Sequence, residues 1–444
     1  MRELRTSSYR IIVPLQNDQY VLLHGYSGAI DIVGKDIMSV LENDDSIFDE
    51  VFDKDTLDIL QKRAYLTTKT EEEEQEYVRR LAEALHRKDK LLYASFTALI
   101  TYDCNFRCSY CFERNPAVSK LCNHAMTKEM ADKMFGSIEK ILSTKEHKTT
   151  NILLFGGEPL LAENKHIVNY IVDEGTKRGY TFEAITNGYN LDVFVDLLAQ
   201  DKIKNIQVTI DGMEMMHNSK RVHKDGIPTF SKIVSNVGLA LDRDIRVVVR
   251  YNTDRKNTGQ LVQLKEYFDK LGYTKNDNFV IDSARLMDYD NQTNNSQFFS
   301  QEEFIKEHEQ LNFEYACHDY NMYSRILAAI QNKKPLPYSS TFCGSQSGNY
   351  VFDPFGKVYP CLEVVGKSIH QIGDYTNGTI EMHDEERQKW RSANVMSYSS
   401  CRKCKYALLC GGGCYANNIA SHRCLHMGEI INYAVRRAYG NINI

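Results

Sequence analysis

The chain has 444 residues, which is too long for one compact core and enough for two or three domains. Hydrophobic residues make up 42% and charged residues 25%, the balance of an ordinary globular protein, and no apolar run is long enough to span a bilayer. The N-terminus has no apolar signal segment, and the net charge of −5 comes without a long basic run. We therefore expect a cytoplasmic protein that has neither nucleic-acid nor membrane partners.

Residues 1–92 begin with three strand-like runs and continue with three helical patterns. The runs are separated by Asn-Asp and glycine-containing turns, and apolar residues then recur at helical spacing. The predicted strands are 9–15, 19–24 and 28–33, and the predicted helices are 35–43, 54–64 and 71–87. We expect these elements to form a small independent module.

Strands and helices alternate through residues 93–300. Such alternation predicts a parallel sheet with right-handed crossovers, and six repeats are too few for a closed eight-stranded barrel. We expect an α/β fold built on a partial (β/α)6 TIM-like barrel, with its site at the C-terminal strand ends. The predicted strands are 95–102, 151–155, 181–186, 206–210, 245–251 and 279–285, and the predicted helices are 127–142, 165–178, 191–200, 230–242 and 259–271.

The rest of the chain divides near residue 342. Residues 301–342 form a predicted bridge, helical to about residue 332, and residues 343–444 are rich in glycine and cysteine, with short elements and no clear periodicity. Such a region seldom builds a core unaided. Twelve cysteines in a chain without an export signal indicate metal ligation rather than disulfides, so we expect a metal-stapled domain.

Three cysteines follow the first predicted strand of the β/α region at a spacing that suits an iron–sulfur cluster. Cys104, Cys108 and Cys111 form a CxxxCxxC motif on one loop. Three thiolates can hold three corners of a [4Fe–4S] cube, which leaves one iron for a small molecule. A zinc knuckle is the alternative, but zinc generally takes a fourth N or S donor. The local candidate, Cys122, has irregular spacing, and we treat it as structural.

The segment LFGGEP (154–159) ends the second predicted strand. Its glycines allow a close approach of the backbone, and Glu158 can pair with an ammonium group. Alone it is as easily a simple turn, but one β/α unit after CxxxCxxC it resembles the radical S-adenosylmethionine (SAM) superfamily. The resemblance implies that Gly156, Gly157 and Glu158 hold the methionine amino group of SAM and that the backbone at Tyr110 contacts the adenine.

Residues at later strand ends fit the same resemblance less specifically. They are Thr186, Asn187 and Gly188 after the third strand, Asp211 and Gly212 after the fourth, and Arg250 and Asn252 after the fifth. By position, Asn187 and Arg250 would bind the cofactor, although each alone is also explained as a structural strand-end residue. His217, Arg221 and Asp225 resemble a segment of the peptide-modifying branch, without an assignable role.

The C-terminal cysteines are spaced as C-x12-G-x4-C from Cys343 to Cys361 and as C-x2-C-x5-C-x3-C from Cys401 to Cys414, with Cys424 beyond. This pattern resembles the SPASM extension of radical SAM proteins, which carries two auxiliary [4Fe–4S] clusters. A zinc ribbon is the alternative. The resemblance assigns Cys401, Cys404, Cys410 and Cys424 to one cluster and Cys343, Cys361 and Cys414 to the other. Three [4Fe–4S] clusters are therefore expected, one of which binds SAM.

The second auxiliary set has only three cysteines. Either Cys317, within a helical pattern from 313 to 330, completes it, or one iron stays open to a substrate thiolate, which is the interpretation we favour. An open iron suits maturases that form thioethers in peptides. The order of elements in residues 1–92 resembles the winged-helix leader-recognition element of such systems, which binds an extended leader by adding it to a sheet edge.

The resemblances together predict a radical SAM/SPASM peptide maturase of the sactipeptide or ranthipeptide type. Its predicted domains are a leader-recognition element (1–92), a radical SAM barrel (93–300), a bridge (301–342) and a SPASM domain (343–444). An electron donor such as flavodoxin or ferredoxin would reduce the Cys104 cluster, SAM would yield a 5′-deoxyadenosyl radical, and a precursor peptide with a leader would gain a Cys thioether. The alternatives are a C–C or C–O crosslink, formylglycine formation, or a zinc-bound noncatalytic peptide or nucleic-acid adaptor.

Overall fold

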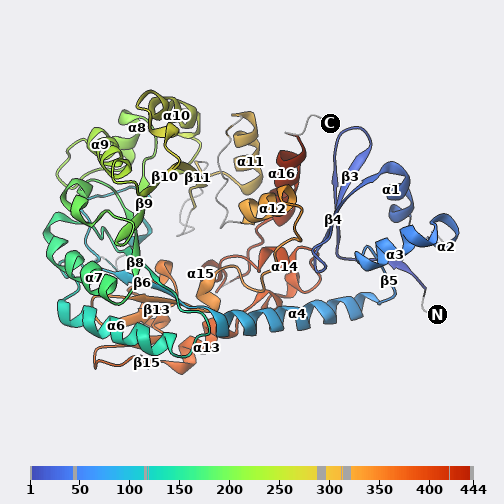
Figure 1. Ribbon diagram of the computed structural model, residues 1–444, viewed down its shortest axis with the longest axis horizontal. Helices are drawn as coiled ribbons and strands as arrows, with labels where there is room; N and C mark the ends of the chain where they lie inside the picture. The colour runs from blue at the N-terminus through green and yellow to red at the C-terminus, as the bar shows by residue number, and fades with distance from the viewer. Residues whose placement is uncertain are drawn as a thin grey trace. The chain divides into compact units, whose positions relative to one another are not determined.

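The computed structural model describes residues 3–43, 48–114, 118, 120–287, 297–311, 313, 322–419 and 421–440 (Figure 1). The chain folds into two compact units, each assembled from separated parts of the sequence. One unit combines residues 1–88, 318–343 and 393–444, and the other combines residues 89–317 and 344–392. The predicted domain boundaries stay a prediction. The compact units divide the chain differently, because residues 344–392 belong to the same unit as the barrel.

The barrel unit is built on six parallel strands in sequence order, β6 to β11, as the alternation predicts. Helices α6, α7, α9 and α10 lie along the outer side of this curved sheet (Figure 1). The strands are β6 (Ser95–Leu99), β7 (Asn151–Phe155), β8 (Thr181–Thr186), β9 (Ile203–Thr209), β10 (Arg246–Thr253) and β11 (Phe279–Arg285). The helices are α6 (Lys128–Leu142), α7 (Lys165–Lys177), α8 (Glu214–Lys220), α9 (Phe230–Leu241) and α10 (Leu261–Lys270).

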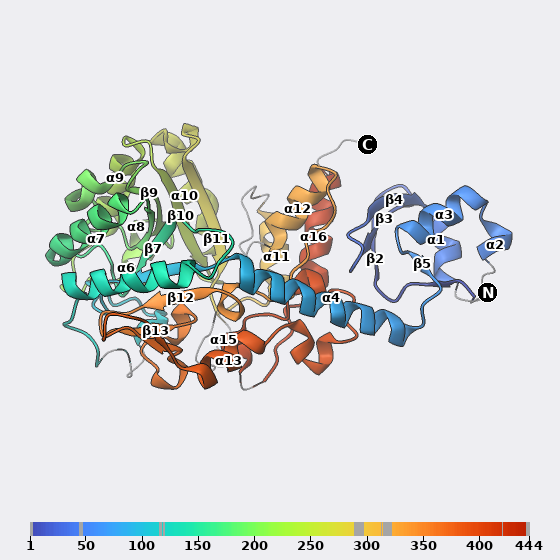
Figure 2. The ribbon, with the colours of Figure 1, turned by 60° about the horizontal axis from the view of Figure 1, so that its bottom comes forward.

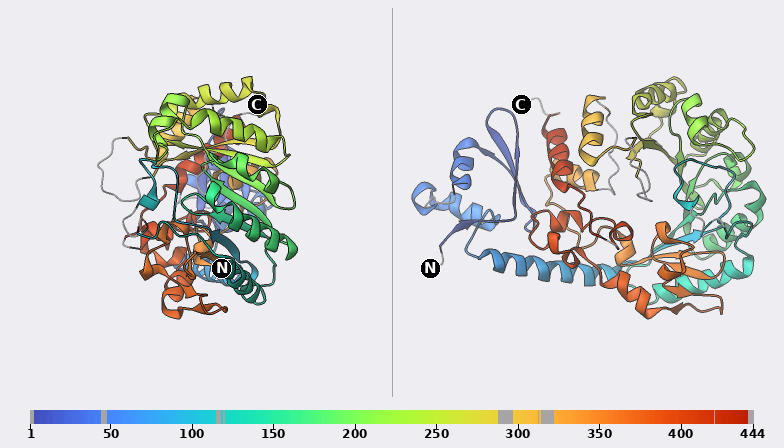
Figure 3. Two further views of the ribbon diagram at one scale, coloured as in Figure 1. Left: turned by 90° about the vertical axis from the view of Figure 1, so that its left-hand side faces the viewer. Right: turned by 180° about the vertical axis from the view of Figure 1, so that it is seen from behind.

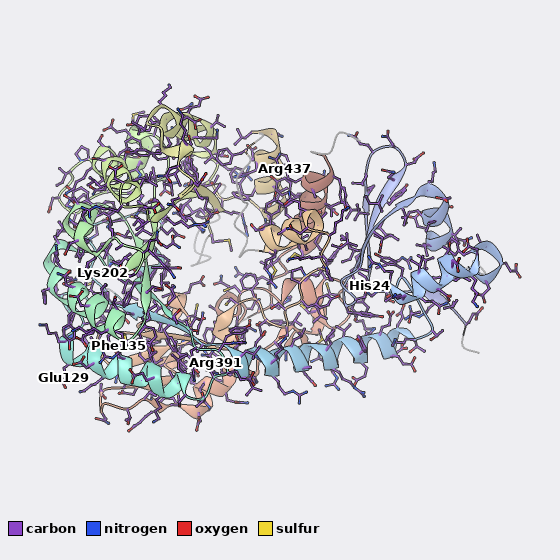
Figure 4. All side chains as sticks on the ribbon, viewed as in Figure 1. His24, Glu129, Phe135, Lys202, Arg391 and Arg437 are labelled. Carbon is purple, nitrogen blue, oxygen red and sulfur yellow. The ribbon has the colours of Figure 1, made fainter. Side chains whose placement is uncertain are left out.

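Helix α6 shows why these segments fold as they do. Thr127 caps its N-terminus by accepting a hydrogen bond from the Met130 amide at 3.2 Å. Its buried residues recur at intervals of three and four, which forms one apolar stripe against the sheet. Phe135, labelled in Figure 4, lies in that stripe, is fully buried, and stacks on Tyr180 with ring centroids 6.1 Å apart.

Four further short strands, which the sequence analysis did not predict, extend the sheet beyond β6. They are β12 (Asn349–Phe352), β13 (Lys357–Tyr359), β14 (Gly373–Asp374) and β15 (Glu381–Met382). β12 pairs with β6 in parallel, and the other three follow antiparallel. Helix α13 (Asp384–Ser392) carries Arg391, labelled in Figure 4, whose guanidinium donates to the carbonyl oxygens of Ser345 and Asn349. The pairing of β12 with β6 joins residues 344–392 to the barrel, and the Arg391 contacts hold α13 to the start of this segment.

Two predictions of secondary structure were wrong. Residues predicted as a helix over 191–200 form the 3-10 helix η3 (Leu191–Leu197), because Leu191, Phe194 and Leu197 are buried at a spacing of three, the repeat of that helix. The last hundred residues contain a regular helix, α16 (Met427–Gly440), although we expected only short elements there. The predicted bridge contains α11 (Gln301–Gln310) and α12 (Met322–Gln331), and residues 312 and 314–321 between them lie outside the described residues.

The other unit contains a three-stranded antiparallel sheet in the order β2-β3-β4, in agreement with the winged-helix-like pattern. Its strands are β2 (Arg10–Pro14), β3 (Gln19–His24) and β4 (Ile30–Gly34), with a small pair formed by β1 (Arg5–Thr6) and β5 (Leu66–Thr67). Its helices are α1 (Lys35–Glu42), α2 (Phe48–Val51), α3 (Lys54–Lys62) and the start of α4 (Glu71–Leu92). Helices α12 and α16 of the same unit lie side by side in Figures 2 and 3, and Tyr323 stacks on Tyr433 with centroids 5.0 Å apart.

A buried hydrogen-bond network joins β3 to α4 in this unit. Glu74 accepts from Ser7 Oγ at 2.6 Å, from Tyr26 OH at 2.8 Å and from Arg5 Nη2 at 2.6 Å. His24 Nε2 (labelled in Figure 4) lies 2.9 Å from Ser7 Oγ, and burial lowers the pKa of His24 to about 4. The carboxylate bonds the serine rather than the histidine, and both His24 and Ser7 are buried, so the network is structural.

No helix among the described residues is both long enough and apolar enough to cross a bilayer.

Candidate functional site

Cys104, Cys108 and Cys111 lie on the loop that leaves β6 at its C-terminal end, where a parallel sheet places its site residues. Burial is the main cause that raises the pKa of the Cys104 thiol, and the charges of Glu158, Cys108 and Cys111 add to it. Burial, with Glu113 and Cys108, raises the pKa of Cys111 to about 12. The three thiols therefore lie close enough to interact. Each would favour its thiolate only beside a compensating positive charge, such as the iron of a cluster.

The GGE turn is fastened to this cysteine loop by main-chain hydrogen bonds. The Gly157 amide donates to the Thr101 carbonyl at 2.9 Å, and the Glu158 amide donates to the Asp103 carbonyl at 2.8 Å. A Cβ on Gly157 would lie only 2.4 Å from the Asp103 carbonyl oxygen, and Gly156 has a φ of 151°. The close approach that these glycines allow is therefore to the cysteine loop.

Glu158 is the last residue of this turn and is almost completely buried. Its carboxylate accepts hydrogen bonds from Thr186 Oγ1 at 2.5 Å, from the Asn187 amide at 2.6 Å and from the Leu160 amide at 2.9 Å. Burial is the main cause that raises its pKa, against the effect of these bonds. A fixed, buried carboxylate beside Cys104 fits the predicted ammonium partner, because a positive charge would offset its desolvation.

Asn187 also reaches the cysteine loop. Its Nδ2 donates to Asn105 Oδ1 at 2.8 Å and lies 4.0 Å from Cys104 Sγ. The Phe106 amide donates to the same sulfur at 3.3 Å. The third strand end, the GGE turn and the cysteine loop are thus joined by one set of hydrogen bonds.

The side chain of Tyr110 connects the loop to the fourth and fifth strands. Its hydroxyl donates to Asp211 Oδ2 and accepts from Arg221 Nη1 at 2.7 Å and from Asn252 Nδ2 at 3.3 Å. The Asn252 amide donates to Asp211 Oδ1 at 3.0 Å, so both oxygens of this carboxylate are engaged. Tyr110 therefore fixes the position of the third cysteine, and this role of its side chain is additional to the predicted backbone contact.

The predicted cofactor residue Arg250 forms an ion pair with Asp282, with Nη1 3.2 Å from Oδ2. A second, more deeply buried pair joins Lys220 Nζ to Asp254 Oδ2 at 2.9 Å. The Arg250 pair lies on adjacent strands in register, because Arg250 of β10 pairs with Asp282 of β11. Arg250 is thus held at the strand ends, and its contact with a cofactor stays a prediction.

Two charged residues near the cysteine loop had no role assigned from the sequence. Arg221 is buried, its guanidinium lies 5.6 Å from the centre of the Phe106 ring, and it is close enough to Cys108 to interact with its charge. Glu113 Oε1 is buried and has no hydrogen-bond partner among the described residues, and burial raises the pKa of Glu113 to about 8. Position after strand four indicated Arg221, whereas Glu113 follows Cys111 by only two residues without any pattern.

A second group of cysteines gathers in residues 401–424. Burial and the charges of Cys401, Cys404 and Cys424 raise the pKa of Cys410 to about 12, so all four members of the predicted set lie near one another. His422, which no sequence pattern indicated, also lies here, with its Nε2 3.5 Å from Cys401 Sγ. Four grouped thiols fit the ligand set of a cube.

The second predicted set stays a prediction, and its cysteines are divided between the two compact units. Cys343 and Cys414 belong to the same compact unit as Cys401, Cys361 belongs to the barrel unit, and Cys317 lies outside the described residues. Among the described residues, no three His, Cys, Asp or Glu side chains are arranged to hold a single metal ion. A cube distributes its ligands over separate irons, so this observation concerns single-ion sites and not clusters.

Comparison with known proteins assigns the class. Residues 99–262, which contain the CxxxCxxC loop and the GGE turn, match the family model of the radical SAM superfamily. The chain therefore contains a radical SAM domain, and binding of SAM and an iron–sulfur cluster is expected of this domain.

Among its relatives, the chain is similar to a cysteine-type anaerobic sulfatase-maturating enzyme from Clostridium perfringens, at 24% identity over 330 residues, which is 70% of this chain and 85% of that protein. Its fold is similar to native anSMEcpe with bound AdoMet (TM-score 0.60, 18% identity, 79% of this chain and 99% of that chain). It is also similar to Streptococcus suis SuiB bound to precursor peptide SuiA (TM-score 0.55, 12% identity, 95% and 99%). These structures confirm the predicted α/β fold.

Proposed function

We propose that the chain is a peptide maturase that binds the leader of a precursor peptide and joins a cysteine sulfur of that peptide to a carbon of another residue. Peptide-bound relatives support this proposal, since anSMEcpe has been solved with the Cp18Cys peptide and SuiB with its precursor peptide SuiA. The observation that carries it is the outward-facing main chain at Ile32 on the edge strand β4, in a chain that also holds the cysteine loop and the GGE turn.

The hydrogen bonds around β4 show which main-chain groups face outward and which of these are already engaged. The Gly28 carbonyl accepts from the Leu336 amide at 3.0 Å, and the Ile30 carbonyl accepts from Arg63 Nη2 at 2.7 Å, so both point away from β3 and both already have a donor. Main-chain groups alternate in direction along an antiparallel strand, which places the amide and carbonyl of Ile32 on the same outer side. The Ile32 side chain is 45% exposed. An edge of this kind can pair with an extended peptide.

At the barrel end, each group has a defined task in the proposed reaction. SAM bound at a reduced cluster supplies a 5′-deoxyadenosyl radical, which removes hydrogen from the peptide. Cys104, Cys108 and Cys111 would ligate that cluster, and Glu158 would accept hydrogen bonds from the methionine ammonium. The Tyr110, Asp211 and Arg221 network would keep the loop in place while the peptide is exchanged.

The proposed bond type rests on the cysteine sets. Cys401, Cys404, Cys410 and Cys424 would provide full ligation of one auxiliary cluster, and Cys343, Cys361 and Cys414 would leave a position for a substrate thiolate on the other. An auxiliary cluster held by these cysteines would supply a site for the substrate sulfur and an acceptor for the electron released when that sulfur bonds to carbon. Flavodoxin or ferredoxin would supply the first electron, so the proposal includes three [4Fe–4S] clusters.

Formylglycine formation is the second candidate, because the curated relative is a cysteine-type sulfatase-maturating enzyme that matches 70% of this chain. Mass spectrometry distinguishes the two outcomes. A thioether removes two hydrogens and one free thiol for each link, whereas formylglycine replaces the thiol of a cysteine with an aldehyde oxygen.

The leader role is tested best with a point variant rather than by removing residues 1–92. Tyr9, Tyr26 and Val78 share a hydrophobic core with Val395 and Leu408, so truncation would expose that core. Ile32→Pro removes one outward amide, and proline is tolerated on edge strands. Ile32→Ala keeps the amide and is the matched control.

Both variants should be reconstituted anaerobically as full chains and given a cysteine-containing precursor peptide encoded beside the gene. We expect Ile32→Pro to slow precursor processing by at least about tenfold, with peptide-independent formation of 5′-deoxyadenosine unchanged. Ile32→Ala should remain within about threefold of the parent. Normal processing by a folded Ile32→Pro protein would refute the leader-binding role.

A further inference from the structure

A cleft of about 470 Å³ runs along the outer edge of β4. Three parts of the same compact unit line it: residues 27–32, the end of α3 at Lys62 and Arg63, and the turn after α12 at residues 333–335. Tyr439 of α16 also lines the cleft, and burial, together with the nearby charge of Asp31, raises its pKa. The leader-binding edge is therefore part of a composite groove to which C-terminal elements contribute.

The rim of this groove is basic. Lys62, Lys333 and Lys334 are exposed, and none of them has an ion-pair partner among the described residues. Arg63 is already neutralised by Asp31, with Nε 2.5 Å from Oδ2. Three ammonium groups that have no ion-pair partner in the described part of the chain form a local excess of positive charge, although the net charge of the chain is −5.

Apolar side chains line the groove from two sides. Ile30 and Ile32 line it from β4, and Ile330 and Pro335 line it from the α12 side. An extended strand added to β4 would turn alternate side chains to opposite faces, so one set could contact these apolar residues and the other the lysines. A nucleic acid has no amide and carbonyl ladder to offer β4, so the strand edge favours a peptide.

We infer that the groove binds an extended leader segment in which apolar side chains alternate with aspartate or glutamate. This inference rests on the proposed function and specifies the chemistry of the leader. Main-chain pairing with Ile32 of β4 would fix the register, the apolar lining residues would contact every second side chain, and Lys62, Lys333 and Lys334 would face the carboxylates.

Two fluorescein-labelled probes test this inference on the anaerobically reconstituted full chain. They are fourteen-residue peptides of alternating valine and threonine, one with three glutamates and the other with three lysines at threonine positions. The groove variant is Lys62→Glu/Lys334→Glu. Lys333 is left unchanged because its φ of 50° makes its backbone sensitive to substitution. The matched control is Lys54→Glu/Lys88→Glu, which makes the same change of charge at two exposed lysines that do not line the groove.

Fluorescence anisotropy should show the glutamate probe binding at least about tenfold more tightly than the lysine probe at low salt. The groove variant should lose that preference or reverse it, and the control variant should keep it. N-methylation of the probe amides that would face β4 should abolish binding, whereas methylation of the alternate amides should not. Equal binding of both probes, no binding of either, or equal loss in the control variant would overturn the inference.

Competition distinguishes a peptide from other anions. If inorganic phosphate or a thymidine oligonucleotide displaces the glutamate probe at equal charge concentration, and methylation has no effect, the groove binds anions and the peptide assignment is wrong. If Ile32→Pro impairs precursor processing while the lysine reversals do not, the leader role stands and the acidic specificity fails. If neither change affects processing, both proposals fail.

Discussion

The two groups of cysteines are built in opposite ways. Cys104, Cys108 and Cys111 follow a strand whose residues Phe96, Ala98 and Leu99 are buried, and their loop is tied to the next strand end by main-chain hydrogen bonds. The cysteines of 401–424 lie among the one-turn helices α14 (Ala407–Cys410) and α15 (Tyr415–Asn418), with three left-handed glycines between them at 411–413. Residues 421–426, which include the exposed Cys424, form no helix or strand.

The two cysteine sites are held in shape by different interactions. In the barrel, burial of apolar strands and pairing between neighbouring strands bring the cysteine loop and Glu158 together before any cofactor binds. In the C-terminal region, Ala407 and Leu408 join a core with Tyr9 and Val78, but no regular element holds the segment around Cys424. The barrel site is therefore expected to keep its shape without metal, whereas the C-terminal site should depend on its ligands.

The largest expected effect comes from the barrel cysteines. Cys104→Ala should reduce reductive SAM cleavage by at least about a thousandfold, because the cluster loses one of three ligands. The C-terminal clusters should remain. Chromatographic measurement of 5′-deoxyadenosine, together with iron and acid-labile sulfide analysis, checks both points. Loss of all iron from this variant would show that the two sites are not independent.

The next largest effect is on the stability of the unit that contains the C-terminal cysteines. His24 packs against Tyr26, which belongs to the core that the C-terminal region shares with the N-terminal part of its unit. The pKa of His24 is lowered from 6.5 to about 4, mainly by burial. The unfolded chain thus takes up the proton first, and stability is complete above pH 6.5 and lost as the pH falls toward 4. The loss should approach about 3 kcal/mol. Urea unfolding at several pH values measures it, and His24→Gln, which cannot titrate, should show a smaller slope.

Gly157→Ala should break the contact between the GGE turn and the cysteine loop. Its Cβ would meet the carbonyl oxygens of Asp103 and Tyr102 at 2.4 and 2.5 Å, so we expect a loss of about 2 kcal/mol and a lower affinity for SAM. Gly259→Ala, whose Cβ would have no atom within 4 Å, is the control and should be neutral. Thermal unfolding and equilibrium binding of SAM measure the two effects. An unchanged melting temperature would show that the loop adjusts freely.

The smallest effect is local and tests the dependence on metal. Removing iron with a chelator should accelerate proteolytic cleavage within residues 421–426 by about tenfold, with little change in the barrel. Cys424→Ala should behave in the same way even with iron present. Cleavage sites can be identified by mass spectrometry after brief digestion. Equal protection of this segment in the apo and loaded proteins would show that its packing suffices without ligands.

Local patterns in the sequence were sufficient for much of the barrel. The six parallel strands and most of the helices follow from repeats of apolar residues, and CxxxCxxC and GGE are recognisable because each lies within a few residues. The predictions from these patterns were wrong where buried residues recur for a reason other than an α-helix or a long strand. The spacing of three in η3 was mistaken for an α-helix, and β12 to β15 are too short for a periodic signal. His422 was missed because its neighbour Cys401 lies 21 residues away, and Glu113 was missed because only the fold brings it near Glu158.

By itself, the sequence determined the class of this protein, because its two motifs and the β/α repeat are local features set by side-chain chemistry and backbone periodicity. Only the tertiary structure decided that Gly156 and Gly157 allow the GGE turn to contact the cysteine loop. It also decided that Tyr110 joins the cysteine loop to Asp211, and that lysines from α3 and the α12 turn line one groove beside β4. Each of these facts depends on residues brought together by long-range strand pairing and burial, which no short pattern encodes.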